Sequence, residues 1–503
     1  MTISRSRPVQ IHPDETWKRL FGALNREGQP LNVQIRRIIV GGIETGVLGA
    51  HTRLPSTRQL AGMLGIARNT VTAAYQLLID EGFLIARERS GIFVSAAIIQ
   101  TAQPQPAVSV PDVWQNRFAI LPSGMPQILK PRDWLNYPYP FLFGQYDPAL
   151  FPTNNWREAV KTASSVKEIQ SWAGDMVDDD DPDLVEQLRI QVLPRRGIFA
   201  RTGEIIVTIG SQQALSMLVQ LLVGRETTVG VEDPGYPDVR NMVSLATGRV
   251  EHLACDGDGV VPGEALARCD VAFVTACHHC PTTAVMPLDR RKQLIAQAER
   301  DDILFVEDDY EADLSVERDS DLPSLKSLDT TGRVIYVGSF SKVLAPGLRV
   351  GYIVAPRPVI DELRVLRRLM LRHPPTNNQR ALASFIALGH YRQHLQKTGE
   401  VIYQRAKGIA ALLPEVLPGC RFRRGEGATS FWIEGPEGFN ARELIDRARR
   451  EGILIEAGDI FFADAARHAN TFRLGFSSIA THHIEPGLRR LGRVFAEVMS
   501  LTV

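Results

Sequence analysis

The sequence is poor in cysteine and has no long uninterrupted apolar stretch. Its 503 residues contain five cysteines, namely Cys255, Cys269, Cys277, Cys280 and Cys420. An odd and sparse set argues against a disulfide framework and favours a reducing cytoplasm. The best apolar candidate, residues 214–223, is broken by Ser216 and Gln220 and is shorter than the roughly 18 apolar residues of a membrane span. The N-terminus also lacks the apolar core of a secretion signal.

The chain has no net charge, because 57 Lys and Arg balance 57 Asp and Glu. With 44% hydrophobic and 23% charged residues, the composition is typical of folded globular proteins and excludes disordered and fibrous classes. The charge is nevertheless uneven, since residues 1–95 hold twelve Lys and Arg against seven Asp and Glu. A basic N-terminal part before an acidic remainder favours a polyanionic partner.

The length predicts two or three domains at roughly 150 residues each. Between residues 96 and 140 prolines and glutamines recur with little helical or strand period, which predicts a semi-rigid extended linker. We therefore expect a head over 1–95, a linker over 96–140 and a body over 141–503. Within the body, the acidic run Asp178–Asp181 predicts a solvated loop.

The head contains a predicted helix-turn-helix. Pro55 precedes Ser56, which can cap a helix together with Gln59, and Gly65 ends that helix. A second helix from Arg68 to about Asp80 is predicted by apolar residues at helical spacing, which are Val71, Ala74, Tyr75 and Leu78. Two short helices joined by a tight turn define the motif.

Polar and basic side chains occupy the positions that would face DNA. The second helix starts with polar residues, and two short strands at 83–86 and 91–94 flank a charged tip, as in a wing. The same geometry also occurs as mere packing, but the wing and the basic bias favour double-stranded DNA as partner. The expected DNA-contacting residues are Ser56, Thr57, Arg58, Arg68, Asn69, Thr70, Thr72, Arg87 and Arg89.

The head resembles the GntR-type winged helix. The resemblance is carried by residues 30–35, 53–61 and 68–71, by Ala74-Tyr75 and by Glu81-Gly82. Two positions depart from that family. Ala67 replaces a Ser that usually caps the second helix, and Arg89 replaces a glycine common in the wing, so phosphate contacts at these two positions are expected to differ.

The body alternates short apolar runs with helical stretches, which predicts an α/β domain with a largely parallel, buried sheet. The runs are residues 205–207, 228–231, 271–274, 303–306, 334–337 and 351–354. Ligands of such folds bind beyond the carboxyl ends of the strands. Functional residues are therefore expected where these runs end.

Two strand ends carry reactive groups. One is followed by residues 307–310, where alternation places Asp308 and Tyr310 on one face and Asp309 on the other. The next carries Lys342 between serines, with Arg349 behind it. Such a lysine suits a Schiff base to an aldehyde cofactor that bears a phosphate. An ordinary ion pair between the acids and the lysine is the alternative.

These segments resemble a fold-type I pyridoxal-phosphate aminotransferase, which has a large α/β domain and a small C-terminal α+β domain. The resemblance implies pyridoxal 5'-phosphate, with Lys342 as the Schiff-base lysine, Asp308 at the ring nitrogen and Tyr310 at the phenolate oxygen. It implies that Arg473 binds a carboxylate of the ligand. The implied cofactor-binding residues are Ser211, Gln212, Tyr236, Cys280, Asp308, Tyr310, Ser339, Ser341, Lys342 and Arg349.

A GntR-type head joined to such a body resembles the MocR/GabR subfamily of transcription regulators. The resemblance implies a cytoplasmic, head-to-tail homodimer that binds an operator. It also implies that an amino compound is sensed by forming an external aldimine in place of Lys342. An active aminotransferase that carries a DNA-binding domain is the alternative.

The stretch from Cys277 to Thr283 departs from the aminotransferase pattern Asn-Pro-x-Gly. Cys280 replaces the asparagine, and a thiol is a weak hydrogen-bond donor, so a sensor is favoured over an efficient transaminase. A closed zinc site needs a second ligand pair besides Cys277 and Cys280, and the sequence has none, so no metal is expected. Redox pairing of these two thiols stays open.

Overall fold

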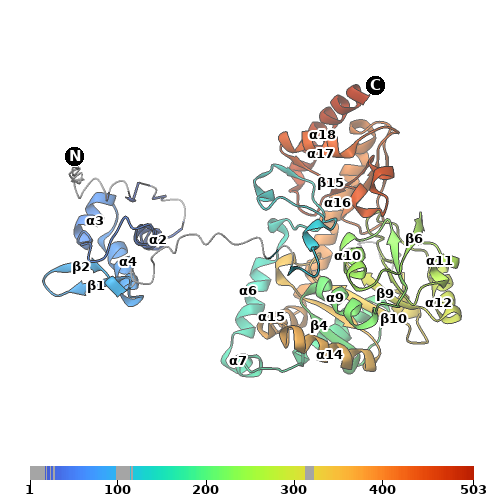
Figure 1. Ribbon diagram of the computed structural model, residues 1–503, viewed down its shortest axis with the longest axis horizontal. Helices are drawn as coiled ribbons and strands as arrows, with labels where there is room; N and C mark the ends of the chain where they lie inside the picture. The colour runs from blue at the N-terminus through green and yellow to red at the C-terminus, as the bar shows by residue number, and fades with distance from the viewer. Residues whose placement is uncertain are drawn as a thin grey trace, which may run out of the picture. The chain divides into compact units, whose positions relative to one another are not determined.

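The computed structural model describes residues 29–97, 117–311 and 322–502, together with residues 17, 20–22, 24–25 and 114. It divides into two compact units, Met1–Ala119 and Ile120–Val503 (Figure 1). Residues 120–140, which the sequence assigned to the linker, therefore belong to the second unit. Proline-rich composition is misleading here, because β3 (Tyr139–Pro140) pairs with β14 (Ile453–Leu454) and the Asn241 amide donates to the Pro126 carbonyl at 2.7 Å.

The first unit is a winged helix-turn-helix. Its described elements are α2 (Leu31–Glu44), α3 (Thr57–Leu64), α4 (Arg68–Asp80) and the antiparallel wing of β1 (Leu84–Arg87) and β2 (Gly91–Val94). Ile35 and Ile39 of α2, Leu60 of α3 and Val71 and Tyr75 of α4 share one buried core. The two helices of the motif and the second strand begin and end where the sequence predicted.

Local sequence explains the turn between α3 and α4. The Gln59 amide donates to Ser56 Oγ at 3.3 Å, and the Ser56 amide donates to Gln59 Oε1 at 3.0 Å, which is a complete capping box. Gly65 ends α3 in the left-handed region with φ of 61°. Ala67 precedes α4 and makes no side-chain cap, as its identity requires.

The second unit is built on an eight-stranded sheet. In spatial order its strands are β4 (Ile205–Thr208), β11 (Gly351–Val354), β10 (Val334–Ser339), β9 (Leu304–Asp309), β8 (Val271–Val274), β5 (Val229–Asp233), β6 (Val250–Asp256) and β7 (Gly259–Val260). Neighbours from β10 to β6 are parallel, and β11 is antiparallel to both of its neighbours. Each predicted apolar run lies in this sheet, so the α/β prediction is confirmed.

Helices cover both faces of the sheet (Figure 1). Ile206 and Val337 pack with α9 (Gly210–Leu222), α10 (Pro237–Ala246) and α14 (Arg357–Leu371). Their neighbours Val207 and Tyr336 face α8 (Pro182–Gln187) and α15 (Thr376–Ala387). Burial on both faces explains why the runs are continuously apolar. The remaining helices of this part are α6 (Thr153–Ala163), α7 (Val166–Trp172), α11 (Glu264–Ala267), α12 (Leu288–Asp301) and α13 (Leu325–Leu328).

A smaller α+β part follows, as the aminotransferase resemblance implied. Its sheet has the order β12 (Arg421–Arg423), β13 (Ser430–Glu434), β16 (Thr471–Gly475) and β15 (Glu456–Ala457). Its helices are α16 (His390–Val416), α17 (Ala441–Arg450) and α18 (Thr481–Thr502). One core joins these helices to the strands, with Ile409, Leu444 and Leu491 buried against Phe431 and Phe472. No helix among the described residues is long and apolar enough to cross a membrane.

The acidic run at 178–181 is a loop as predicted, but its second half is buried, so the expected solvation is wrong there. Asp180 is 6% exposed and accepts from Arg364 at 3.0 Å and from Arg367 at 2.5 Å. Asp181 is 2% exposed, caps α8 and pairs with Arg380 at 2.8 Å. The partners are distant in sequence, and therefore no local pattern reveals them.

Helix capping gives a stability prediction for the first unit. We expect Ser56→Ala to destabilise it by about 1 kcal/mol, because the α3 capping box is lost, and Ala67→Ser to stabilise it by a similar amount, because α4 gains a cap. Thermal unfolding of an isolated fragment 1–119 checks both variants. Equal unfolding temperatures for the three proteins would show that neither cap matters.

Candidate functional site

One cavity of about 620 Å³ lies in the second unit, beyond the carboxyl ends of β9 and β10 and at the N-terminus of α9. The structure brings every sequence-predicted cofactor and effector residue to it. They are Ser211, Gln212, Tyr236, Cys280, Asp308, Tyr310, Ser339, Ser341, Lys342, Arg349 and Arg473. Their roles toward a cofactor stay predictions.

Strand alternation separates the acids of β9 as expected. Asp308 lines the cavity, whereas Asp309 points to the other face, where it accepts from Arg196 and from the Tyr336 hydroxyl, both at 2.8 Å. Burial and the nearby Asp309 raise the pKa of Asp308 to about 7. Burial and the nearby Lys130 lower the pKa of Lys342 to about 8. Lys342 therefore loses its proton more readily than a free lysine does.

Two buried polar atoms of the cavity lack hydrogen-bond partners in the part of the chain that the structure describes, and pyridoxal phosphate would fit both. Asp308 Oδ1 and Ser341 Oγ are buried and have no hydrogen-bond partner among the described residues. Both belong to residues that line the cavity, and buried polar atoms in native proteins are normally paired. A pyridine nitrogen and a phosphate oxygen would supply the two missing partners.

A site suited to an anion is formed where α9 begins. Gly210 has φ of +73°, and a Cβ there would lie 3.0 Å from the Arg349 guanidinium. Arg349 Nη2 donates to the Ile209 carbonyl at 2.9 Å, which holds the guanidinium beside the first turn. Free backbone N–H groups of a helix N-terminus, an arginine and the hydroxyls of Ser339 and Ser341 together suit a dianion.

Tyr236 is fixed in the cavity wall by hydrogen bonds. Its hydroxyl lies 3.0 Å from both Gln212 Oε1 and Asp238 Oδ2, and Gln212 Nε2 donates to the same Asp238 oxygen at 2.9 Å. Burial raises the pKa of Tyr236 well above its usual value. The ring is thus a neutral aromatic wall, as a stacking partner needs to be.

Sequence reasoning missed the residues around Arg473. Arg473 Nε donates to Glu456 Oε2 at 3.0 Å, and Lys130 Nζ lies 3.3 Å from Glu456 Oε1. The ring of Phe143 lies 4.1 Å from Arg473 Cζ and 4.5 Å from Lys342 Nζ. The pairing of β15 with β16 sets Glu456 opposite Arg473. Only that register reveals the pair, and β15 is a two-residue strand with no periodic signal.

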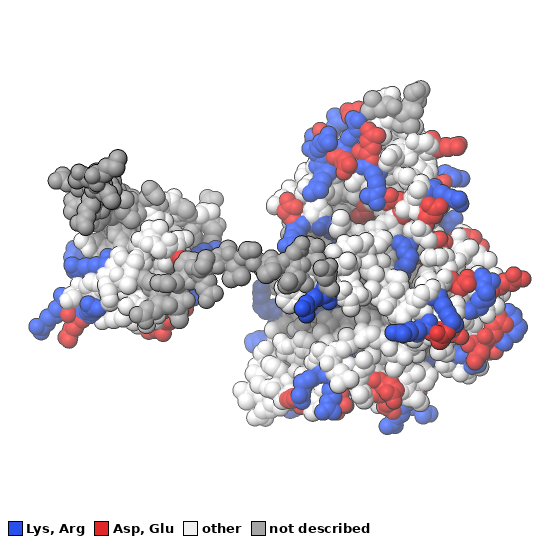
Figure 2. Space-filling model, viewed as in Figure 1, with Lys and Arg blue, Asp and Glu red and all other residues white. Residues whose placement is uncertain are grey.

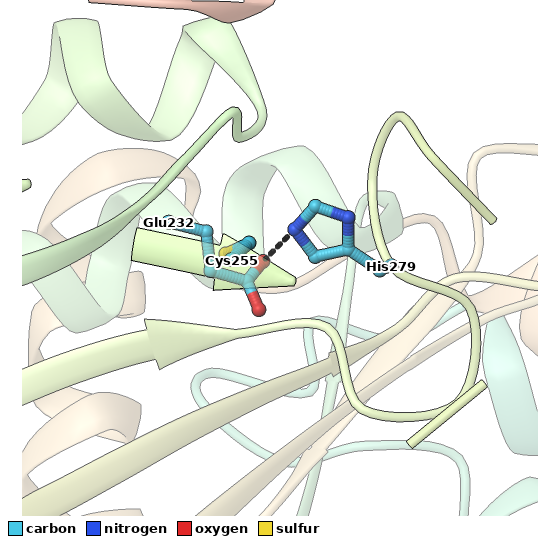
Figure 3. Close-up of side chains that lie close together, drawn as sticks. All are labelled: Glu232, Cys255 and His279. Atoms are coloured by element: carbon cyan, nitrogen blue, oxygen red, sulfur yellow. Dashed lines mark ion pairs between the residues drawn. The ribbon is translucent and has the colours of Figure 1, made fainter. Parts of the chain in front are cut away.

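The side chains of residues 277–280 diverge. Cys280 lines the same cavity as Lys342, whereas Cys277 and His278 line a separate cavity of about 420 Å³. His279 points toward Glu232 and Cys255 (Figure 3). All five cysteines are free thiols. The thiols of Cys277 and Cys280 therefore lie in different cavities.

Glu232, Cys255 and His279 form a buried cluster (Figure 3). One potential ligand atom from each lies within 4.8 Å of the others, and Glu232 Oε2 is 3.8 Å from His279 Nε2. Burial raises the pKa of Glu232 to about 8, raises that of the Cys255 thiol above its usual range and lowers that of His279 to about 4. All three shifts favour the neutral form of the group.

Glu232 also supports the cavity that Lys342 and Cys280 line. It accepts from the Thr275 amide at 3.0 Å and from the Thr275 hydroxyl at 2.6 Å. Thr275 Oγ1 in turn accepts from the Cys280 amide at 3.0 Å. The cluster therefore fixes the backbone that presents Cys280.

We predict that this cluster does not retain zinc. Protein dialysed against zinc and then desalted should carry well under one ion per chain, because a protonated carboxyl and thiol are poor ligands. Elemental analysis of wild type and His279→Gln checks this, since glutamine keeps a polar side chain at this position but removes the imidazole. Stoichiometric zinc in wild type alone would contradict the prediction.

The predicted DNA-contacting residues lie on α3, α4 and the wing. Arg58, Asn69 and the wing arginines are exposed, and Figure 2 shows charged side chains gathered at the wing. Arg68 Nε donates to Thr57 Oγ1 at 3.3 Å, which links the two helices. Arg89 has φ of 59°, a value that explains why related wings place glycine there. Their contacts with DNA stay predictions.

Comparisons with known proteins agree with this architecture. Residues 31–94 match the family of bacterial regulatory proteins of the gntR type, and residues 142–491 match aminotransferase class I and II. The α-aminoadipate aminotransferase LysN of Thermus thermophilus superposes with a TM-score of 0.69 at 28% identity, covering 77% of this chain and 99% of LysN. The chain is thus a GntR-type regulator fused to an aminotransferase-like domain.

Relatives that match most of the chain identify a subfamily within this class. The regulator TauR of Rhodobacter capsulatus is 41% identical over 473 residues, which cover 92% of this chain and 96% of TauR. The probable rhizopine catabolism regulatory protein MocR of Rhizobium meliloti is 31% identical, covering 76% of this chain and 77% of MocR. The chain belongs to the MocR/GabR subfamily of GntR-type transcription regulators.

Proposed function

We propose that this regulator binds pyridoxal 5'-phosphate at Lys342 and senses a small amino compound there. The observation that carries the proposal is the cavity itself. It joins a buried lysine of lowered pKa, an unpartnered buried carboxylate and a dianion site, in one chain with a DNA-binding head. A head alone would not need the lysine, and an enzyme alone would not need the head.

When bound, the cofactor supplies an aldehyde that exchanges reversibly between two amines. The chain's own residues prepare that exchange. The lowered pKa of Lys342 leaves its amine a better nucleophile and leaving group near neutral pH. Asp308 Oδ1 is positioned to hold a proton at a ring nitrogen, and Arg473 presents a guanidinium to an acid group of the effector.

An active aminotransferase is the second candidate, and the complete cavity favours it. Cys280 favours the sensor. Burial raises the pKa of its thiol to about 12, so it stays protonated and can donate only a weak hydrogen bond to the cofactor oxygen. Binding and amine exchange depend on Lys342 and the pocket, whereas turnover also needs the donor at position 280.

We further propose a head-to-tail homodimer in the cytoplasm that binds double-stranded operator DNA. α14 exposes Val365, Leu369 and Met370, with Leu369 80% exposed, an apolar surface that a second copy could cover. A twofold dimer would present two heads to two half-sites. A DNA partner requires the compartment that holds the chromosome.

Lys342→Ala tests the sensor. We expect it to lose the cofactor's imine absorbance and all effector dependence of DNA binding, while binding DNA without effector. Absorbance titration with a panel of amino acids, followed by a mobility assay on the DNA upstream of its own gene, checks this. Lys326→Ala is the matched control, since Lys326 pairs with Asp329 outside the cavity. Effector-dependent DNA binding in Lys342→Ala would falsify the proposal.

Product analysis separates sensor from enzyme. With an amino acid that shifts the absorbance, we expect no accumulation of keto acid over many equivalents, because Cys280 weakens the electronics of turnover. Cys280→Asn should increase keto-acid formation if that reason is correct. Rapid keto-acid release by wild type would establish the aminotransferase instead.

Asn69→Ala tests the DNA interface. An exposed polar side chain in the first turn of α4 is expected to contact a base, so its loss should weaken operator binding by about 1–3 kcal/mol. Gln76→Ala on the same helix is the control, because Gln76 donates to Asp80 and lies two turns further on. Equal weakening by both variants would place the interface elsewhere.

A further inference from the structure

A further cationic side chain, that of Lys130, lines the cavity and comes from the N-terminal end of the second unit. We call residues 122–130 the entry segment. Five of its residues line the cavity, namely Pro122, Met125, Gln127, Ile128 and Lys130. The segment is held by Asn241, whose amide donates to the Pro126 carbonyl at 2.7 Å. The segment comes shortly after Ala119, where the first unit ends. The chain that leaves the head therefore lines this cavity as soon as it enters the second unit.

Lys130 is tied to the cavity by Glu456. Its ammonium lies 3.3 Å from Glu456 Oε1 and also donates to the Phe143 carbonyl. The other oxygen of Glu456 accepts from Arg473 at 3.0 Å and from the Phe143 amide at 3.2 Å. The Glu456 and Arg473 side chains are only 3% and 2% exposed, and Lys130 is 22% exposed. One buried carboxylate thus bridges two cations.

The charges of this bridge do not cancel. Burial favours the neutral form of Glu456, but Arg473 and Lys130 outweigh it and hold its pKa below the usual value, so the carboxylate is ionised. Burial also lowers the pKa of Lys130. Two cations against one carboxylate leave an unbalanced positive charge, which an additional anion would neutralise.

Glu456 already holds Arg473 through one donor. Arg473 Nε is paired with Glu456 before any effector arrives, so an acid group that draws the guanidinium toward itself weakens that contact. Arg473 Cζ and Lys342 Nζ lie 4.1 Å and 4.5 Å from the centre of the same Phe143 ring. A ligand whose amine and acid groups are a few carbon atoms apart can therefore reach both.

We propose that Glu456 is an internal substitute for the effector's acid group and that Lys130 is a positioning residue that couples its displacement to the entry segment. The effector class is then a short primary amine with one acid group. Arrival of that group at Arg473 weakens the Glu456–Arg473 pair, shifts Glu456 and Lys130, and loosens the segment next to the head's linker. This inference rests on the proposed amine sensing, because it names what that site selects and how it reports.

The first experiment compares acidic amines with their neutral analogues. The full-length protein loaded with pyridoxal phosphate is titrated with glycine, 3-aminopropanoate, 4-aminobutanoate and 2-aminoethanesulfonate, each against an alkylamine of matched length. Cofactor absorbance reports binding, and hydrogen exchange of a peptide covering residues 120–130 reports the entry segment. We expect one acid to bind at least about tenfold more tightly than its analogue and to increase exchange in that peptide.

Variants separate coupling from binding. Lys130→Met should still show the absorbance shift, but its entry segment should exchange equally with and without effector. Glu456→Gln removes the competitor, so the acidic amine should bind about tenfold more tightly, again without a change in exchange. Lys326→Met, which alters a pair outside the cavity, should behave as wild type. If Glu456→Gln does not fold, Lys130→Met alone decides.

Two outcomes would overturn the inference. Weaker effector binding in Glu456→Gln would mean that Glu456 orients Arg473 rather than competing with the ligand. An absorbance shift in wild type with unchanged exchange of residues 120–130 would mean that the entry segment is not coupled. Both leave amine sensing intact. Absence of any absorbance shift with every amine would instead remove the proposed function, and the inference with it.

Discussion

Burial of the large sheet on both faces is the constraint from which the cavity follows. Charged residues are costly in the middle of such strands, so they gather toward the carboxyl ends. At the end of β9 the pleat sends Asp308 into the cavity and Asp309 to the opposite face, where Arg196 neutralises it. The two consecutive aspartates therefore have different roles. Asp309 forms an ion pair within the fold, and Asp308 keeps for a ligand an oxygen that has no hydrogen-bond partner among the residues described.

Several titratable groups in the cavity have pKa values that differ from their ordinary ones. Burial lowers the pKa of Lys342 and raises that of Asp308, so the lysine and the acid both move toward neutrality. Arg473 and Glu456, which touch each other, both stay ionised. The pair with shifted pKa values suits a reaction that moves protons near neutral pH, and the ionised pair suits recognition of a charged ligand.

Sequence predicted what short-range patterns encode. A capping box located α3, the helical spacing of apolar residues located α4, apolar runs located the strands, and the resemblance located Lys342 and Arg473. It could not predict contacts between distant segments. Residues 120–140 looked like linker because prolines disrupt local periodicity, yet they pack against the body. Asp180 looked solvated because Arg367 lies far along the chain. Glu456 gave no signal at all, because its importance arises only from the register of β15 against β16.

Cys280 differs from an aminotransferase asparagine in its chemistry more than in its placement. Its amide is anchored through Thr275 to buried Glu232, and its side chain lines the cavity beside Tyr310. The backbone is therefore held firmly, and what changes is the donor: a buried thiol with a pKa of about 12 in place of an amide. A firm scaffold with a weak donor fits the proposed sensor, which needs binding and exchange of amines but not the steps that complete a turnover.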